Sequence, residues 1–236
     1  MASAIIGTGA VFDAYMNVFF WEFSTEDMKW FSIAAMVGVT ISLITIKPLQ
    51  ARFEKRDIFI TCLLMGSILQ IAKVAARFFE ILPENGDPLL LQIFIIHGSL
   101  GSFFAFTFFI VFGSMMADIA DEQEDAKDLR QEGVFSGGIT FSNKSTTAFG
   151  TIIGGFLLES VIQMPVGAVV GEIEYVTLVK MAVIDGIIMP TLMVVPVLLV
   201  WKYSLSRDAV TSIQTELREK RTDFRSHPST GSTDYR

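Results

Sequence analysis

Residues 113–155 read GSMMADIADEQEDAKDLRQEGVFSGGITFSNKSTTAFGTIIGG. A long apolar run over 89–117 leads directly into the charged part of this stretch, and a second apolar run containing Lys144 follows it. Charges between two apolar runs of membrane-spanning length are typical of a loop at a membrane face. A lysine inside such a run costs about 2.5–3.5 kcal/mol on insertion scales, so Lys144 indicates a functional position.

The composition of the whole chain favours the same class of protein. Of its 236 residues, 51% are hydrophobic and 18% are charged, and most of the charges fall in a few short blocks. These features predict an all-α protein that crosses a lipid membrane several times. The formal charge of −7 and the lack of a basic face argue against a nucleic-acid partner.

Residues that bind metals or perform catalysis are sparse. The only cysteine, Cys62, lies in an apolar segment, and the two histidines, His97 and His227, are far apart in the chain. There is no cluster with metal-ligand spacing, no nucleophile beside a base, and no glycine-rich phosphate loop. We therefore expect no metal site, no cofactor and no enzymatic activity.

Six apolar segments have the length of about 18–28 residues that a membrane-spanning helix requires. Their apolar character is continuous rather than alternating, which favours helices over the strands of a membrane barrel. We expect the helices near 3–22, 29–46, 57–82, 89–117, 134–161 and 175–201, followed by a polar tail over 202–236.

The orientation follows from lysine and arginine in the short loops, which mark the cytoplasmic side. The loop after the second segment contains Lys47, Arg52, Lys55 and Arg56, and the tail is also basic. The alternate loops contain few basic residues. We therefore predict that both termini are cytoplasmic and that the membrane is the plasma (inner) membrane.

Several polar residues interrupt the apolar segments. Asp13 in the first segment is read either as a cavity carboxylate or as a residue paired with another helix, because buried charges in membranes are costly. Lys73 and Arg77 are expected to extend toward the near interface. His97 is expected to be packed or hydrogen-bonded. Asp185 in the last segment has Lys180 as a possible partner.

The fifth segment shows the most regular pattern. Its polar and small residues recur every three or four positions and so share one helix face: Gly137, Thr140, Lys144, Thr147, Thr151 and Gly155. We interpret this face as the wall of a water-filled path; the alternative is a polar seam between packed helices. Gly150 and Gly154 have the spacing of a helix-packing pair. The partner of Lys144 is expected to be Asp13 or a carboxylate on another six-helix half.

The charged stretch ADIADEQEDAKDLRQEG (117–133), followed by a helix containing Thr140 and Lys144, resembles the glycoside–pentoside–hexuronide:cation symporters of the major facilitator superfamily. The stretches KPLQARFEKRD (47–57) and AYMNVFFWEF (14–23) also resemble that family, so the likeness covers residues 1–201. Glu122 and Gln123 stand where the family commonly has tyrosine and glycine. The matching charged residues are Asp118, Asp121, Glu124, Arg130 and Glu132, together with Arg52, Lys55 and Arg56 of the basic loop.

The resemblance implies the C-terminal six helices of a transporter that couples uptake of a sugar or another small organic solute to Na⁺ or H⁺. The coupling-ion carboxylates lie in the family's N-terminal six helices, so a missing N-terminal half or a partner half is expected. The cavity side chains are expected to be Asp13, Thr140, Lys144 and Thr147, and the charged loop is expected to form a network of ion pairs. The alternatives are a lipid or lysolipid carrier of a related branch and a membrane interaction protein that transports nothing.

Overall fold

The computed structural model describes residues 2–127, 132–201 and 209–217. Within these ranges the chain is helical, without strands, and six helical units are long and apolar enough to cross a membrane. The predicted all-α membrane fold is therefore confirmed. The elements are α1 (Ala2–Tyr15), η1 (Met16–Phe20), α2 (Thr25–Arg52), α3 (Lys55–Phe78), α4 (Pro88–Lys127), α5 (Glu132–Phe156), η2 (Leu157–Ile162), α6 (Tyr175–Val183), η3 (Ile184–Ile188), α7 (Met189–Leu192) and α8 (Val194–Val200).

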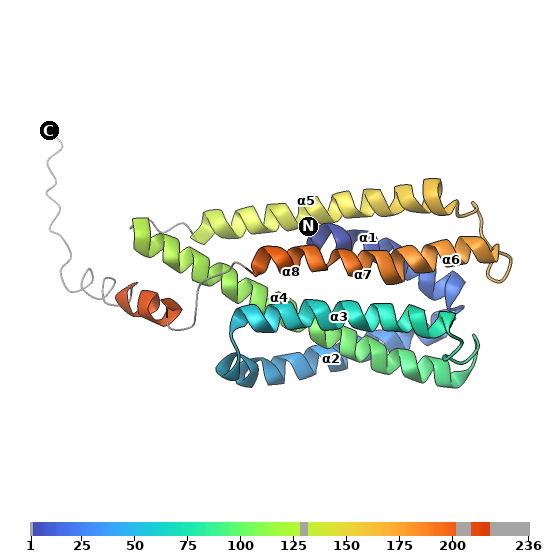
Figure 1. Ribbon diagram of the computed structural model, residues 1–236, viewed down its shortest axis with the longest axis horizontal. Helices are drawn as coiled ribbons and strands as arrows, with labels where there is room; N and C mark the ends of the chain where they lie inside the picture. The colour runs from blue at the N-terminus through green and yellow to red at the C-terminus, as the bar shows by residue number, and fades with distance from the viewer. Residues whose placement is uncertain (1, 128–131, 202–208, 218–236) are drawn as a thin grey trace, which may run out of the picture.

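The six helical units run side by side along the long axis of the molecule (Figure 1). The end at which α2 meets α3, on the left of Figure 1, is called the Lys55 end here, and the opposite end, where η1 meets α2, is called the Trp21 end. The chain thus runs toward the Trp21 end in α1, α3 and α5, with α1 beginning nearer the middle of the bundle (Figure 1), and it runs toward the Lys55 end in α2, α4 and the α6–α8 unit.

Two helix boundaries differ from the sequence-based expectation for identifiable reasons. The second helix begins at Thr25 rather than near 29, because Ser24 and Asp27 form a capping box that satisfies its first backbone amides. The fourth helix continues to Lys127, although a loop was expected from Asp118 onward. At about 1.5 Å per residue, the charged segment extends α4 by ~15 Å beyond the apolar run.

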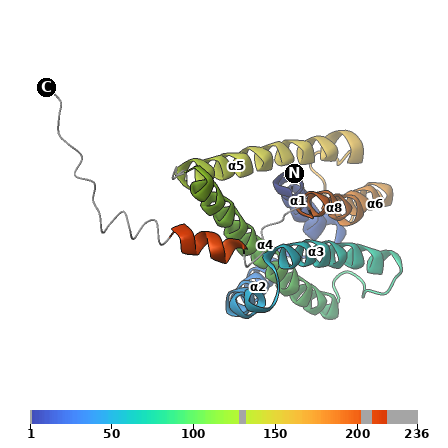
Figure 2. The same cartoon turned by 60° about the vertical axis from the view of Figure 1, so that its left-hand side comes forward.

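The α5 helix packs along α1 and stands apart from α2 in both ribbon views (Figure 2). A side chain at Gly150 would collide with the carbonyl of Ala4, and one at Gly7 would collide with the carbonyl of Thr147. The Thr8 hydroxyl donates a hydrogen bond to the Gly150 carbonyl at 2.9 Å. Small residues therefore let the two backbones touch, as is common between membrane helices.

The α2 and α4 helices form a second close pair. A side chain at Gly38 would collide with the backbone of Ser99, and the hydroxyls of Ser42 and Thr107 lie 2.8 Å apart in a buried hydrogen bond. These two pairs form two sides of the bundle, and α3 and the α6–α8 unit pack between them (Figure 2).

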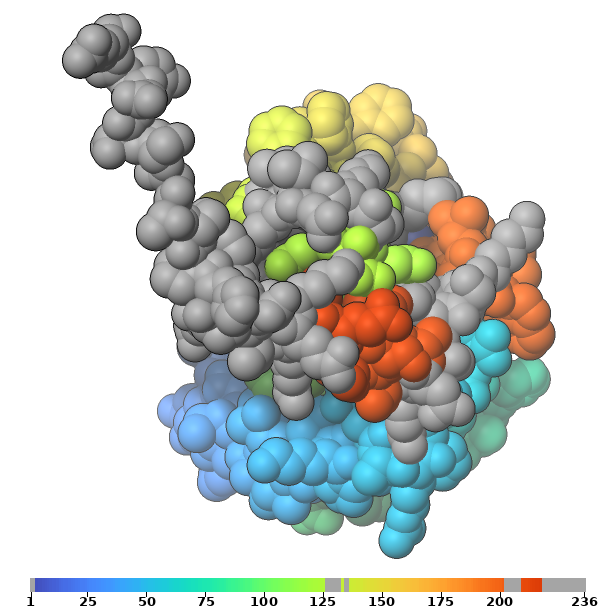
Figure 3. Space-filling view, turned by 90° about the vertical axis from the view of Figure 1, so that its left-hand side faces the viewer, coloured from blue at the N-terminus to red at the C-terminus, as the bar shows by residue number. Residues whose placement is uncertain are grey.

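Apolar side chains fill the bundle as two separate clusters. The cluster nearer the Trp21 end includes Phe12, Trp21, Val74, Phe94 and Met181, and the cluster nearer the Lys55 end includes Phe59, Cys62, Phe108, Val111 and Val197. Residues 209–217 form a further helix that lies against the Lys55 end, where Figure 3 shows it beside α2, α3 and α4. Its Leu217 is buried.

Candidate functional site

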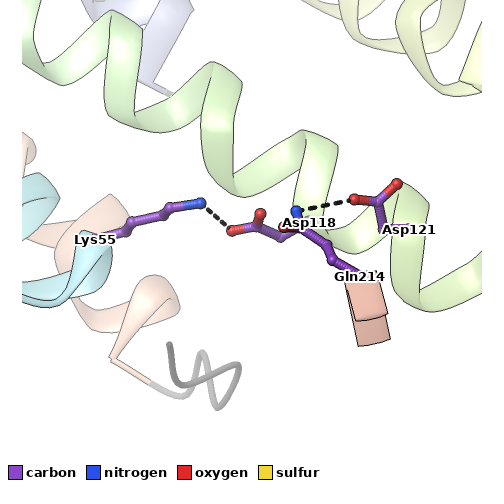
Figure 4. Close-up of polar contacts among 4 residues, drawn as sticks. All are labelled: Lys55, Asp118, Asp121 and Gln214. Carbon is purple, nitrogen blue, oxygen red and sulfur yellow. Dashed lines mark hydrogen bonds and ion pairs between the residues drawn. The ribbon is translucent and has the colours of Figure 1, made fainter. Parts of the chain in front are cut away.

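A buried ion pair joins the basic loop to the charged motif at the Lys55 end. The Lys55 ammonium donates a hydrogen bond to a carboxylate oxygen of Asp118 at 2.6 Å, and the Asp118 side chain is only 3% exposed (Figure 4). The first turn of α3 supplies the lysine, and α4 supplies the aspartate. The pair therefore ties two helices together at the point where both leave the apolar part of the bundle.

The next residue of the charged motif, Asp121, contacts the helix over 209–217. The Gln214 amide donates a hydrogen bond to Asp121 at 3.3 Å, one turn beyond Asp118 (Figure 4). A small cavity of about 200 Å³ lies between Asp118, Lys55 and Gln214. Glu124 lies on the next turn of α4 and is partly exposed. Arg130 lies outside the described residues, and Glu132 begins α5 without a described side chain.

The other two basic residues of the loop have different surroundings. Arg52 ends α2 and is exposed. Arg56 forms an ion pair at 3.2 Å with its neighbour Asp57, and both side chains are about half exposed. Only Lys55 among the three thus makes a buried contact with the charged motif in the described part of the chain.

The predicted cavity residues of α5 are all exposed on the six-helix unit. Thr140, Lys144 and Thr147 each have exposed side chains, and no ion pair to Lys144 is present among the described residues. Asn143, the residue before Lys144, faces α1 and accepts a hydrogen bond from Ser3 at 2.9 Å. Lys144 is therefore displaced by about 100° from the α1–α5 contact.

Asp13 cannot be the direct partner of Lys144. The Ser3–Asn143 contact places Lys144 level with Ser3, and Asp13 lies ten residues further along α1, or ~15 Å along the helix axis. Ala4 contacts α5, and Asp13 lies two and a half helical turns after Ala4. Asp13 therefore lies on the side of α1 that faces away from α5. Of the two partners that the sequence predicts as alternatives, Asp13 is therefore excluded.

Asp13 instead has an exposed side chain that acts electrostatically on charges nearer the Trp21 end. Lys73 on α3 lies within electrostatic range of both Asp13 and Asp185. Its ammonium lies 5.5 Å from the centre of the Phe94 ring, so the expectation that it extends to the interface is wrong. Lys180, the expected partner of Asp185, is exposed. Arg77 does reach the end of the bundle, where it donates hydrogen bonds to Pro83 and Asn85.

A chamber of about 380 Å³ opens beside this group of charges, between α1, α3, α4 and the η3–α7 segment. Asp185, Gln70 and His97 line it nearer the Trp21 end, and Cys62, Phe108 and Met193 line it nearer the Lys55 end. A side chain at Gly186 would collide with Val74, so η3 lies directly against α3 and holds Asp185 in place. The chamber therefore has a polar end and an apolar end.

Two polar atoms at the polar end lack hydrogen-bond partners among the described residues. They are Nε2 of His97 and the carbonyl oxygen of Gln70, and both are buried. The sequence marked Asp185, Lys73 and His97 one at a time, because each is a polar residue in an apolar segment. It did not bring them together, and it did not single out Gln70. The described residues hold no group of three His, Cys, Asp or Glu side chains that suits a metal ion.

The comparisons with known proteins give one match. Residues 2–207 match the model of a family described as MFS/sugar transport protein. Searches of curated proteins and of solved structures found no match. The matched range includes all six membrane helices, the Lys55–Asp118 pair and the chamber.

Proposed function

Because this chain belongs to the MFS/sugar transport protein family, we propose that its six helices form one wall of a cation-coupled symporter for a sugar or another small organic solute. The family and the six apolar helices identify an integral membrane protein of a transporter family, not an enzyme family. In such transporters the solute binds near the middle of the membrane between two repeats, and one repeat rocks against the other. The coupling ion in our proposal is H⁺ or Na⁺.

The observation that supports this proposal most strongly is the exposed polar face of α5. Lys144 lies eight residues inside the apolar span that begins at Ser136, or ~12 Å along the helix. Its side chain and those of Thr140 and Thr151 are exposed on the six-helix unit. A lysine facing lipid at this depth is costly, whereas a lysine facing a water-filled path is not.

This face requires a second six-helix unit on its other side, either in the same polypeptide or as a separate chain. Since Asp13 is too distant, the carboxylate that balances Lys144 belongs to that second unit or to the solute. The α5 threonines add hydroxyl groups that suit the hydroxyls of a sugar. Lys144, Thr140 and Thr147 are therefore the proposed solute-facing residues, and Asp13, whose side chain is exposed on the six-helix unit, stays a proposed cavity residue.

The Lys55–Asp118 pair supports a second part of the proposal, the control of access. The pair joins the α2–α3 connection to α4 and is largely buried. If the pair forms in one access state and is broken in the other, it stabilises the first state. The pair therefore biases the equilibrium between the access states. We propose that this end of the bundle and both termini lie on the cytoplasmic side of the plasma membrane, because the loops at this end and the tail together contain most of the lysine and arginine residues.

Reconstitution tests the proposal directly. Proteoliposomes holding these six helices together with a second six-helix unit are given radiolabelled sugars on the outside, under imposed H⁺ or Na⁺ gradients. The expected result is saturable uptake that requires one of the two gradients, and no such uptake from the six helices alone. Gradient-driven uptake by the six helices alone would contradict the need for a second unit, and uptake indifferent to both gradients would contradict symport.

A further inference from the structure

The chamber beside Asp185 has the properties of a ligand site that the transport proposal does not use. Its lining residues come from four helical units and include none of Thr140, Lys144 and Thr147. The volume of about 380 Å³ lies in the range of small-molecule sites. At ~30 Å³ for each water-sized group, it holds about a dozen such groups.

The chamber is long, and its polarity changes along the membrane normal. Gln70, His97 and Asp185 lie eight to ten residues from the ends of their helical units at the Trp21 end, so they share one level, ~12–15 Å deep. Cys62 and Met193 each lie eight residues beyond, or ~12 Å closer to the Lys55 end. Between the two ends the lining includes only two hydroxyls, those of Ser67 and Ser102.

Potential hydrogen-bond acceptors lie in the wall of the polar end, where those of Gln70 and His97 have almost no accessible surface. The Gln70 carbonyl oxygen is buried and unpartnered among the described residues, and a carboxylate such as Asp185 accepts but does not donate. His97 already forms a hydrogen bond with the backbone of Leu69. Because the amide N–H groups inside a helix are bonded within the helix, the imidazole donates and the Leu69 carbonyl accepts. A neutral imidazole that donates from one nitrogen accepts at the other, so the unpartnered Nε2 is a third acceptor. Buried groups of this kind almost always have a partner.

The charges nearby favour a cation as that partner. Asp13 and Asp185 are two acids within range of one lysine, Lys73, and His97 is the remaining titratable group of the cluster. No ion pair within 4.0 Å joins Lys73 to either acid in the described residues. Lys73 does not line the chamber, because its ammonium lies over Phe94. Counted as formal charges, the two acids and the lysine leave one negative charge in excess.

We propose that this chamber binds an amphipathic primary amine, whose ammonium meets Asp185, Gln70 and His97 and whose apolar body extends toward Cys62, Phe108 and Met193. A primary ammonium has three N–H donors. Asp185 accepts the strongest of its hydrogen bonds, because a charged donor bonds most strongly to a carboxylate, and rotation of the Gln70 and His97 side chains supplies the other two acceptors. The apolar end excludes water and accepts a hydrocarbon chain. The site lies within the six helices and goes beyond the proposed transport, so it is testable without a transport assay.

Photo-crosslinking of the purified chain in phosphatidylcholine nanodiscs tests the site. The probe is n-octylamine with a diazirine on its terminal carbons, and peptide mass spectrometry locates the adducts. The expected adducts lie on Cys62, Phe108 or Met193. Unlabelled n-octylamine should compete with the probe, whereas n-octanol and octyltrimethylammonium, which lack a charged N–H donor, should not.

Variants of the lining residues test whether the probe is bound in the chamber. Asp185→Asn should lower the labelling about tenfold or more, as expected for the loss of a charge-assisted hydrogen bond, and Gln70→Leu should lower it less. Gly66→Leu should abolish labelling by filling the chamber, since a side chain there meets no other atom within 4 Å. Gly113→Leu on α4 is the matched control, because it also meets nothing and does not line the chamber.

Two results would contradict the proposal. Equal labelling of wild type, Asp185→Asn and Gly66→Leu, or equal competition by n-octanol, would overturn the proposal, whether or not the protein transports a sugar. Repeating the labelling in nanodiscs of phosphatidylethanolamine tests whether a lipid headgroup or a dissolved amine supplies the ammonium in the membrane. Loss of labelling in that lipid supports a lipid headgroup as the natural occupant, and unchanged labelling supports a dissolved amine.

Discussion

The ammonium of Lys55 lies 2.6 Å from a carboxylate oxygen of Asp118, although 63 residues separate the two in the chain. The aspartate is almost fully buried, and the lysine is about one quarter exposed. A buried carboxylate depends on its partner because removing that partner leaves an uncompensated charge. This pair is therefore the contact at the Lys55 end whose loss should matter most.

Replacing Lys55 tests this dependence. Lys55→Met should lower the free energy of unfolding by about 1–3 kcal/mol, because it leaves the Asp118 carboxylate buried without its donor. Thermal unfolding in detergent measures the change. Arg56→Met is the control, since the exposed Arg56–Asp57 pair should contribute no more than about 1 kcal/mol. If the changes in the free energy of unfolding caused by Lys55→Met and Asp118→Asn were additive in the double variant, the two side chains would not be energetically coupled.

The helix over 209–217 should be held in place by its buried leucine. Leu217 is 5% exposed, and burying a leucine contributes about 1.5–3 kcal/mol. Leu217→Asp should therefore raise amide hydrogen exchange across 209–217 more than tenfold, as expected for local opening. Exposed Glu216→Ala should leave the exchange unchanged. Equal exchange in both variants would mean that the helix does not depend on this contact.

Two glycines of α5 provide a matched test of the α1–α5 contact. A Cβ at Gly150 collides with the Ala4 carbonyl, whereas a Cβ at Gly155 meets nothing within 4 Å. Gly150→Ala should destabilise the protein by about 1–3 kcal/mol through overpacking. Gly155→Ala should be neutral or slightly stabilising, because alanine favours the helix. Thermal unfolding compares them, and equal midpoints would contradict the observed backbone contact.

The orientation is tested with single cysteines in a Cys62→Ala background. Glu84 lies in the α3–α4 connection and Glu122 on the charged part of α4, and both are exposed. A membrane-impermeant maleimide should label Glu84→Cys in intact cells, and it should label Glu122→Cys only after permeabilisation. The reverse pattern would invert the predicted topology.

Lys144 is tested in a complete transporter. Lys144→Ala should abolish concentrative uptake while the protein still inserts and remains monodisperse, because the carboxylate that we propose as its partner would lose its counter-charge. Lys144→Arg should restore uptake poorly, because a planar guanidinium does not replace a compact ammonium. Radiolabelled uptake by proteoliposomes is the measurement. Wild-type uptake by the alanine variant would show that the exposed lysine has no part in transport.

The sequence by itself determined the fold class, the presence of six membrane helices and the block of charges that follows the fourth. Each of these depends on composition along one continuous stretch, which hydropathy reports directly. It also marked Asp13, Lys73, Asp185 and Lys144 as costly residues, because an ionisable group in an apolar segment is unusual wherever its partner lies.

Only the tertiary structure decided which of these residues meet. Lys55 pairs with Asp118, Lys73 is within electrostatic range of Asp13 and Asp185, and Asp13 is ~15 Å along the helix axis from Lys144. Such partnerships depend on which helices are neighbours, how deep each residue lies and which way each helix is rotated. Close contacts at Gly7, Gly150 and Gly186 set those three quantities, and they are properties of helix pairs rather than of any single stretch of sequence.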